Sequence, residues 1–259
     1  MSTIALPLPV KRQNSTKTRG KGKKATKSKS RSRQKIVYVE VVRKRSKRWM
    51  DEFRSALRAE IANCMTHGMG VGLSLAGMSL LIASAAKAGD PWKIVSFAIY
   101  GTCMVLLYLA STLYHGFLSP RAKKVFKVLD HSAIFLAIAG TYTPFTLVSM
   151  RGPWGWTLFI IIWALAIGGI AYKMFFVNKY RLISVLIYIL MGWLVCIAVK
   201  PMFQMIPLAG IIWIAIGGIA YTAGTAFYAS SFAMSHMIWH LFVLAGSICH
   251  YIAIYFYVL

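Results

Sequence analysis

Residues 201–259 read PMFQMIPLAGIIWIAIGGIAYTAGTAFYASSFAMSHMIWHLFVLAGSICHYIAIYFYVL, a run of 59 positions without an Asp, Glu, Lys or Arg. A helix that crosses a bilayer needs about 20 apolar residues, so this run has room for two crossings and a turn. Five more uncharged runs lie upstream, at 61–86, 94–120, 131–150, 152–172 and 182–199. Each of these is long enough for one crossing. The sequence therefore predicts an all-α, polytopic membrane protein with seven transmembrane helices.

The composition excludes a soluble globular domain. Hydrophobic residues make up 58% of the 259 residues and charged residues 14%, with a mean hydropathy of +0.61. Soluble domains are about 45–50% apolar. Pro201, Pro207 and the polar segment 230–235 are expected to mark breaks between helices. The predicted spans are 62–86, 93–116, 128–149, 155–176, 182–200, 207–229 and 236–258.

Positive charge concentrates in the first 48 residues, which hold 17 of the 30 Lys and Arg residues and only one acid, Glu40. Segment 11–35 is almost free of apolar side chains and cannot bury enough surface to fold. We interpret residues 1–48 as a disordered, basic cytoplasmic tail whose partners are membrane lipids, through their anionic headgroups. Nucleic acid as a partner, or an organelle transit peptide, is a less favoured alternative.

A second pattern begins at residue 49, where large apolar side chains recur at every fourth position as far as residue 61. Basic residues lie between them, so residues 49–61 are predicted to form an amphipathic helix at the membrane interface. Residues 62–259 then form the seven-helix membrane domain. The apolar positions of the amphipathic helix are Trp49, Phe53, Leu57 and Ile61.

The orientation follows from the short loops, because cytoplasmic loops carry an excess of Lys and Arg. The predicted loop 117–127 has four basic residues, and segment 173–181 has three. The loops at 87–92 and 150–154 have one each. The amino terminus and the even-numbered loops are therefore expected in the cytoplasm, and the carboxyl terminus outside.

Polar side chains with metal-binding or acid–base chemistry gather at the predicted cytoplasmic ends of the helices, where burial in the membrane makes them costly. Residues four apart share one face of a helix, so His236 and His240 point the same way, as do Ser111 and His115. Glu60, Asn63 and His67 share a third face. His250 lies near the opposite membrane face and is interpreted as a packing or interfacial residue, not a metal ligand.

Three histidines with an open fourth position are typical of catalytic zinc, which makes its bound water acidic enough to attack a carbonyl at neutral pH. We predict that His115, His236 and His240 bind Zn²⁺. Asp130 and Ser111 are the candidate catalytic residues that orient the water or a ligand imidazole. A supporting polar cluster is predicted around this site and consists of Glu60, Asn63, His67 and His131. Its two histidines, His67 and His131, remain alternative metal ligands. Without a metal, the histidine pair of the last span would simply donate hydrogen bonds to carbonyl groups.

Ordered motifs within residues 58–259 resemble those of bacterial hemolysin III proteins, which belong with the progestin and adiponectin receptors in the PAQR superfamily. The motifs are ExxN at 60–63 with THG at 66–68, STLYH at 111–115, LDHSAIFLAIAGTYTPF at 129–145, GGIAYTAGTAFY at 217–228 and SHMIWHLFVLAG at 235–246. The resemblance implies seven helices with a cytoplasmic amino terminus and a location in the bacterial cytoplasmic (inner) membrane. It also implies zinc held by His115, His236 and His240, with Asp130 near the metal. The long basic tail departs from the family's usual short amino terminus.

The resemblance implies more than one function. Eukaryotic relatives are linked to lipid amide hydrolysis, which favours a zinc-dependent lipid amide or ester hydrolase acting in membrane lipid homeostasis. The sequence has no Glu between His236 and His240, so Asp130 would serve as the base. The family name implies a pore-forming cytolysin, but the fourth to sixth predicted helices carry almost no polar residues at their centres. A non-catalytic, zinc-stabilised membrane sensor is the third alternative.

Overall fold

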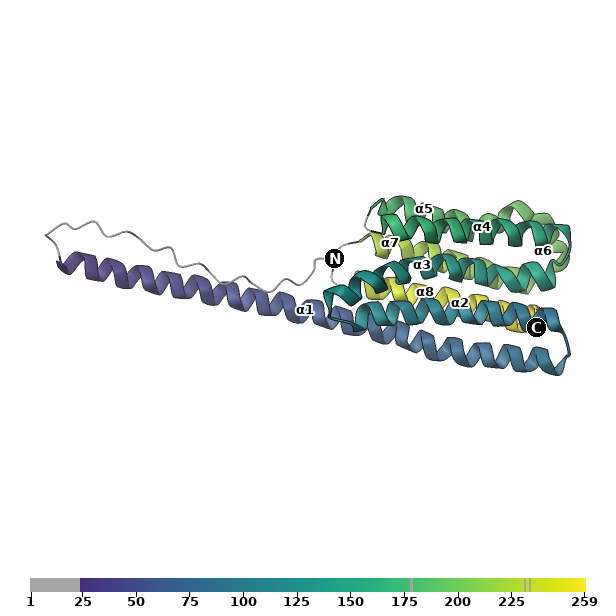
Figure 1. Cartoon of the computed structure of the whole chain (residues 1–259), viewed down its shortest axis with the longest axis horizontal. Coiled ribbons are helices and arrows are strands. Elements are labelled where there is room, and N and C mark those ends of the chain that lie inside the picture. The colour runs from purple at the N-terminus through teal and green to yellow at the C-terminus, as the bar shows by residue number, and fades with distance from the viewer. Residues whose placement is uncertain (1–23, 178, 231, 233) are drawn as a thin grey trace. The chain divides into compact units, whose positions relative to one another are not determined.

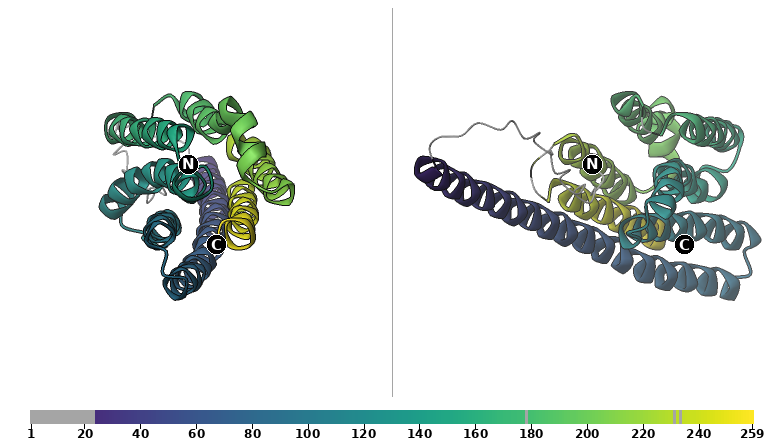
Figure 2. Two further views of the ribbon diagram at one scale, coloured as in Figure 1. Left: turned by 90° about the vertical axis from the view of Figure 1, so that its right-hand side faces the viewer. Right: turned by 60° about the vertical axis from the view of Figure 1, so that its left-hand side comes forward.

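The computed structural model describes residues 24–177, 179–230, 232 and 234–259. Within these residues the protein is helical and has no strand. Helices within residues 59–259 lie side by side, with α3 packed against both α2 and α4 and with α8 packed against α7 (Figures 1 and 2). The elements are α1 (Lys24–Lys87), α2 (Pro91–Gly116), α3 (Pro120–Pro144), η1 (Phe145–Ser149), α4 (Pro153–Phe176), α5 (Arg181–Gly192), η2 (Leu194–Ala198), α6 (Val199–Met205), α7 (Leu208–Ala229) and α8 (Ser235–Tyr257).

Seven segments of the described chain are long and apolar enough to cross a membrane, which confirms the predicted class of fold. Five of them lie in α1, α2, α4, α7 and α8. The third combines α3 with the π-helical turn η1, and the fifth runs through α5, η2 and α6. The many large apolar side chains exposed along these helices, such as Ile160, Ile167 and Leu186, suit contact with lipid.

The amino-terminal part differs from the prediction. α1 is one helix from Lys24 to Lys87, with no break between the predicted interfacial helix 49–61 and the first span. It also includes residues 24–35, which were predicted to be disordered. Lys, Arg, Gln and Ala favour a helix even where they bury nothing, which explains the difference. The rest of the predicted tail, residues 1–23, lies outside the described residues. The chain divides at Arg58 into two units, 1–58 and 59–259.

Two further helix boundaries differ from those predicted from the sequence, one at Pro120 and one at Pro201. α3 begins at Pro120, so the lysines assigned to the loop 117–127 lie on the first turns of that helix. Proline fits the first helical position because the missing N–H has no partner there. Pro201 does not end the fifth span, because it lies in the first turn of α6, where backbone N–H groups also lack helical partners.

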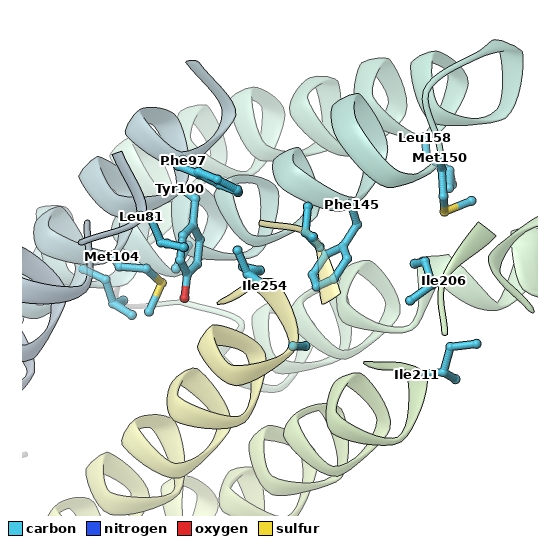
Figure 3. Close-up of a cluster of buried hydrophobic side chains, with 14 of the residues drawn as sticks. Leu81, Phe97, Tyr100, Met104, Phe145, Met150, Leu158, Ile206, Ile211 and Ile254 are labelled. Carbon is cyan, nitrogen blue, oxygen red and sulfur yellow. The ribbon is translucent and has the colours of Figure 1, made fainter. Parts of the chain in front are cut away.

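The buried core that holds these helices together is apolar and lies within residues 59–259. Figure 3 shows part of it, where Leu81, Phe97, Tyr100, Met104 and Ile254 belong to one cluster of buried side chains. Leu81, Phe97 and Ile254 are fully buried. A second cluster joins α3, α4 and α5 through Phe135, Ile162 and Met191. Packing on both sides of α3 and along α8 therefore fixes the helix ends that carry the histidines.

Candidate metal centre

The three histidines predicted as metal ligands come together in the structure. His115 lies in the last turn of α2, and His236 and His240 occupy the first turns of α8. One ligand nitrogen from each lies within 4.8 Å of the others. The His236 and His240 ring centroids are 4.6 Å apart, as expected for neighbours one turn apart on a helix. Among the described residues, these three form the group that can hold a metal ion.

The hydrogen bonds of His115 leave one nitrogen available for a metal. Its fully buried side chain places Nδ1 2.7 Å from Glu60 Oε2. With its proton on Nδ1, the imidazole donates to this carboxylate, and Nε2 has no hydrogen-bond partner in the described part of the chain. Metal-binding histidines usually donate their second N–H to a carboxylate or carbonyl in this way. A buried nitrogen without a partner, on a correctly oriented ring, fits a metal ligand.

His240 has a similar arrangement with a backbone partner. Its Nδ1 lies 3.3 Å from the carbonyl oxygen of Asn63 and 3.2 Å from Thr66 Oγ1, both on α1. The Nδ1–H can donate to the carbonyl, which leaves Nε2 as the metal-binding nitrogen. His67, predicted as part of the supporting cluster, stacks on the His240 ring with centroids 3.6 Å apart. α1 thus supports the two buried histidines of α2 and α8.

Glu60 is itself held by Lys123, a residue that the sequence predicts only as a charge of the loop 117–127. Lys123 Nζ, on the first turns of α3, donates to Glu60 Oε1 over 2.8 Å. The same ammonium lies 5.0 Å from the centre of the Tyr114 ring. This Lys123–Glu60–His115 chain could not be found from spacing, because its members lie on three helices and Glu60 is 55 residues from His115 and 63 residues from Lys123 in sequence. Asn63 lies beside this chain, with Nδ2 3.5 Å from His115 Nδ1, but both nitrogens are donors when Nδ1 carries the proton, so this contact is not a hydrogen bond of the chain.

The remaining predicted site residues lie around the three histidines. The Asp130 carboxylate is 3.5 Å from His131 Nδ1, and both side chains are largely buried. His131 is oriented by two more partners, the Lys127 carbonyl at 2.9 Å and the Tyr228 hydroxyl at 3.4 Å. His67 and His131 do not belong to the metal-binding group found among the described residues. Ser111 is buried one turn before His115, and its Oγ has no hydrogen-bond partner within the described chain.

A mostly apolar cavity of about 140 Å³ opens beside these residues between α3, α5, α7 and α8. Asp130, His236 and His240 are part of its lining. Aromatic and aliphatic side chains from the middle of the bundle make up most of the rest. His250, expected as a packing residue, lines the same cavity and approaches the Ile214 carbonyl with Nε2 at 3.1 Å. This cavity could not be predicted from the sequence, because its walls come from separate spans, mainly α3, α5, α7 and α8, with His67 of α1 and Leu107 of α2.

Replacing Glu60 tests whether the carboxylate supports the metal ligand. Glu60→Gln keeps the shape of the side chain but removes the charge that accepts the His115 N–H. Loss of such a supporting partner typically weakens metal affinity by about 10–100-fold. We expect this loss in zinc titrations of the detergent-purified protein against a competing chelator. Glu52→Gln is the matched control, since Glu52 lies on the same helix and pairs with exposed Arg48 instead. An unchanged affinity in Glu60→Gln would contradict the assigned role.

Comparison with known proteins identifies the family. Residues 55–251 match the model of the family described as Haemolysin-III related. The chain is 47% identical to "Hemolysin-3" of Bacillus cereus over 211 residues, which are 81% of this chain and 96% of that protein. It is 47% identical to the "Hemolysin-3 homolog" of Bacillus subtilis, over 78% of this chain and 95% of the relative.

A more distant relative extends the comparison to animals. The human "Monocyte to macrophage differentiation factor" is 30% identical over 203 residues, which are 76% of this chain and 83% of that protein. This similarity supports the placement in the PAQR-like superfamily. No solved structure matches the chain. The matched region includes all seven apolar spans in whole or in part, so this membrane protein belongs to the haemolysin III-related family.

Proposed function

We propose that this protein is a zinc-dependent membrane hydrolase that cleaves an amide or ester bond of a lipid and acts in membrane lipid homeostasis. The observation that carries the proposal is the meeting of His115, His236 and His240, with ligand nitrogens within 4.8 Å, beside an apolar cavity. Three histidine nitrogens match the donor set of catalytic zinc sites, which keep a fourth position open. Zinc bound there would act as a Lewis acid and supply an acidified water.

The protein's own residues provide the other parts of such a site. Glu60 and the Asn63 carbonyl fix the rings of His115 and His240 through hydrogen bonds. Asp130 lines the cavity together with two of the histidines, and this supports the proposal that its carboxylate accepts a proton from an attacking water. The buried Ser111 hydroxyl, without a partner among the described residues, can orient a polar group at the same depth.

The cavity supports the choice of a lipid as substrate. Its walls are mainly apolar, which suits a hydrocarbon chain, and its polar lining includes Asp130, His236 and His240. A bond to be cleaved would lie at the histidine end, with the acyl chain toward the middle of the bundle. Access from within a membrane is consistent with the apolar, lipid-facing surfaces of the spans.

Membrane lysis is the second candidate function, favoured by the names of the two Bacillus relatives. A pore formed by one chain would need polar side chains along a helix from end to end, because these groups form hydrogen bonds with the water and coordinate the ions that pass through. α4 and the long apolar stretch of α7 offer few such groups. We therefore place lysis behind hydrolysis.

One experiment separates the two functions. The purified protein is placed in liposomes that contain lipid amides and esters with varied headgroups, either with zinc or after chelation. Hydrolysis predicts the release of free fatty acid only with zinc, and no release of an entrapped dye. Absence of hydrolysis over the whole panel, together with dye release unaffected by chelation, would reject the enzyme in favour of the cytolysin.

We further propose that the histidine centre lies on the cytoplasmic side of a bacterial inner membrane. The support is the concentration of Lys and Arg in residues 1–48 and on the first turns of α3. A reporter enzyme fused after Leu259 is expected to be active outside the membrane, and one fused to a chain that ends at residue 123 is expected to be active inside. Reporter activities in bacterial cells check this orientation. The reverse pattern would place the histidines on the outer side and contradict the proposal.

A further inference from the structure

The part of α1 between residues 37 and 58 has a continuous apolar face that the proposed hydrolase does not use. At 3.6 residues per turn, its large apolar side chains fall within an arc of roughly 120°. Only one polar residue, Ser46, interrupts this arc, while Val37 and Val41 lie outside it. The side chains within the arc are Tyr38, Val39, Val42, Ser46, Trp49, Met50, Phe53, Ala56 and Leu57. They extend over about 30 Å of helix.

The opposite face of this segment is strongly basic. Residues 37–58 contain seven Lys and Arg residues against three Asp and Glu residues. Arg43 and Arg54 border the apolar arc on one side, and Arg45 borders it on the other. Arg48 and Glu52 form an exposed ion pair on the polar face, with Nε and Oε1 2.9 Å apart. The segment is thus amphipathic, with positive charge along both edges of its apolar face.

No other element covers this face within the described part of unit 1–58, because the described residues of that unit belong to a single helix. Val39 is 62% exposed and Tyr38 57% exposed. Trp49 and Phe53 stack on each other at 5.5 Å, which forms an aromatic centre on the apolar arc. An apolar face of this length on a basic helix, which the described part of its own unit does not cover, needs a partner that is apolar in the middle and negative at the edges.

We propose that residues 38–57 bind an anionic lipid surface, with the apolar arc inserted at the boundary between headgroups and acyl chains. Tryptophan and tyrosine favour this depth. Arginines at the edges of the arc can extend their side chains to lipid phosphates while their methylene groups remain in contact with the apolar layer. The charge-free run that begins at residue 61 follows directly in the sequence, so the segment is tethered close to a bilayer. The proposal requires the axis of α1 to turn at the boundary between the two units, at Arg58, so that residues 38–57 lie along the membrane surface instead of continuing the axis of the first span.

A second copy of the chain is the other partner that such a face would accept. Paired helices would bring the bordering arginines of both copies together, and the seam would contain Ser46. Like charges beside a seam oppose pairing, whereas negative lipid headgroups neutralise the same residues. Charge complementarity therefore favours the membrane over self-association.

Spin labels on the full-length protein can test this proposal. They require a variant in which the free cysteines Cys64, Cys103, Cys196 and Cys249 are replaced by alanine. Single cysteines for labelling replace Val42 or Phe53 on the apolar arc, and Lys44 or Ser55 on the polar face as matched controls. The protein is placed in lipid nanodiscs of phosphatidylcholine, with or without phosphatidylglycerol. Collision rates with oxygen, which dissolves in the bilayer, and with a water-soluble nickel complex report the depth of each label.

We expect oxygen to reach the labels at residues 42 and 53 at least about twofold more often than those at 44 and 55, and nickel to show the reverse. This contrast should require phosphatidylglycerol and weaken in about 1 M salt, where the screening length is only about 3 Å. Equal accessibility on both faces in anionic discs would overturn the proposal. Strong magnetic coupling between labels of two copies would also overturn it, in favour of self-association. Neither result depends on zinc or on hydrolysis.

Discussion

His240→Ala is expected to reduce zinc from about one ion per chain to none. His240 supplies one of only three ligand nitrogens in the group, and its ring is already oriented by the Asn63 carbonyl. With two histidines left, both the coordination number and the geometry of a zinc site are lost. Metal analysis of protein purified without chelator measures the change.

The same variant should lose the stabilisation that zinc provides. A metal that binds only the folded state adds about 2.7 kcal/mol to the free energy of unfolding when its concentration is 100 times Kd. The melting temperature of the natural protein should therefore rise with added zinc, whereas that of His240→Ala should not respond. His250→Ala is the control, because His250 is a histidine of the same helix outside the metal-binding group. Wild-type protein without any transition metal would show that the histidines form only a packing cluster.

The seven spans were predictable because the signal for a membrane helix is local. A long run without charge is costly anywhere except in a bilayer or a core, and the run from 201 to 259 is too long for one helix. The face shared by His236 and His240 was also local, since a four-residue spacing fixes it. The meeting of these two residues with His115 depended on their common depth, and the structure brings them together as expected.

Other features depend on contacts between distant residues and could not be predicted. The sequence placed Lys123 in a loop, but the structure places it on α3, where it holds the carboxylate behind His115. Glu60 was predicted in the supporting polar cluster, but its hydrogen bond to His115 was not, because the two residues lie on different helices. The beginning of α1 at Lys24 was missed because a lack of apolar residues rules out packing but does not rule out an isolated helix.

Asp130→Asn is expected to keep zinc and to lower the hydrolysis of a lipid amide or ester by about 100- to 10,000-fold, the usual contribution of a general base. The substitution preserves the size of the side chain but removes its ability to accept a proton. Asp130 lines the cavity beside His236 and His240, and its carboxylate lies 3.5 Å from His131 Nδ1. Fatty acid release and zinc content must be measured on the same preparation, because only the pair of results identifies the role.

Asp90→Asn provides the control for this substitution, since Asp90 caps the first turn of α2 at the opposite end of that helix from His115. It should change neither zinc content nor turnover. Loss of zinc together with turnover in Asp130→Asn would make Asp130 a structural support of the metal site. Retention of both zinc and turnover in Asp130→Asn would exclude Asp130 as the base. Glu60 is the other acid beside the histidines, and it already receives hydrogen bonds from His115 and Lys123. Since a carboxylate with both oxygens engaged accepts a further proton less readily, retained activity would indicate a mechanism without a carboxylate base.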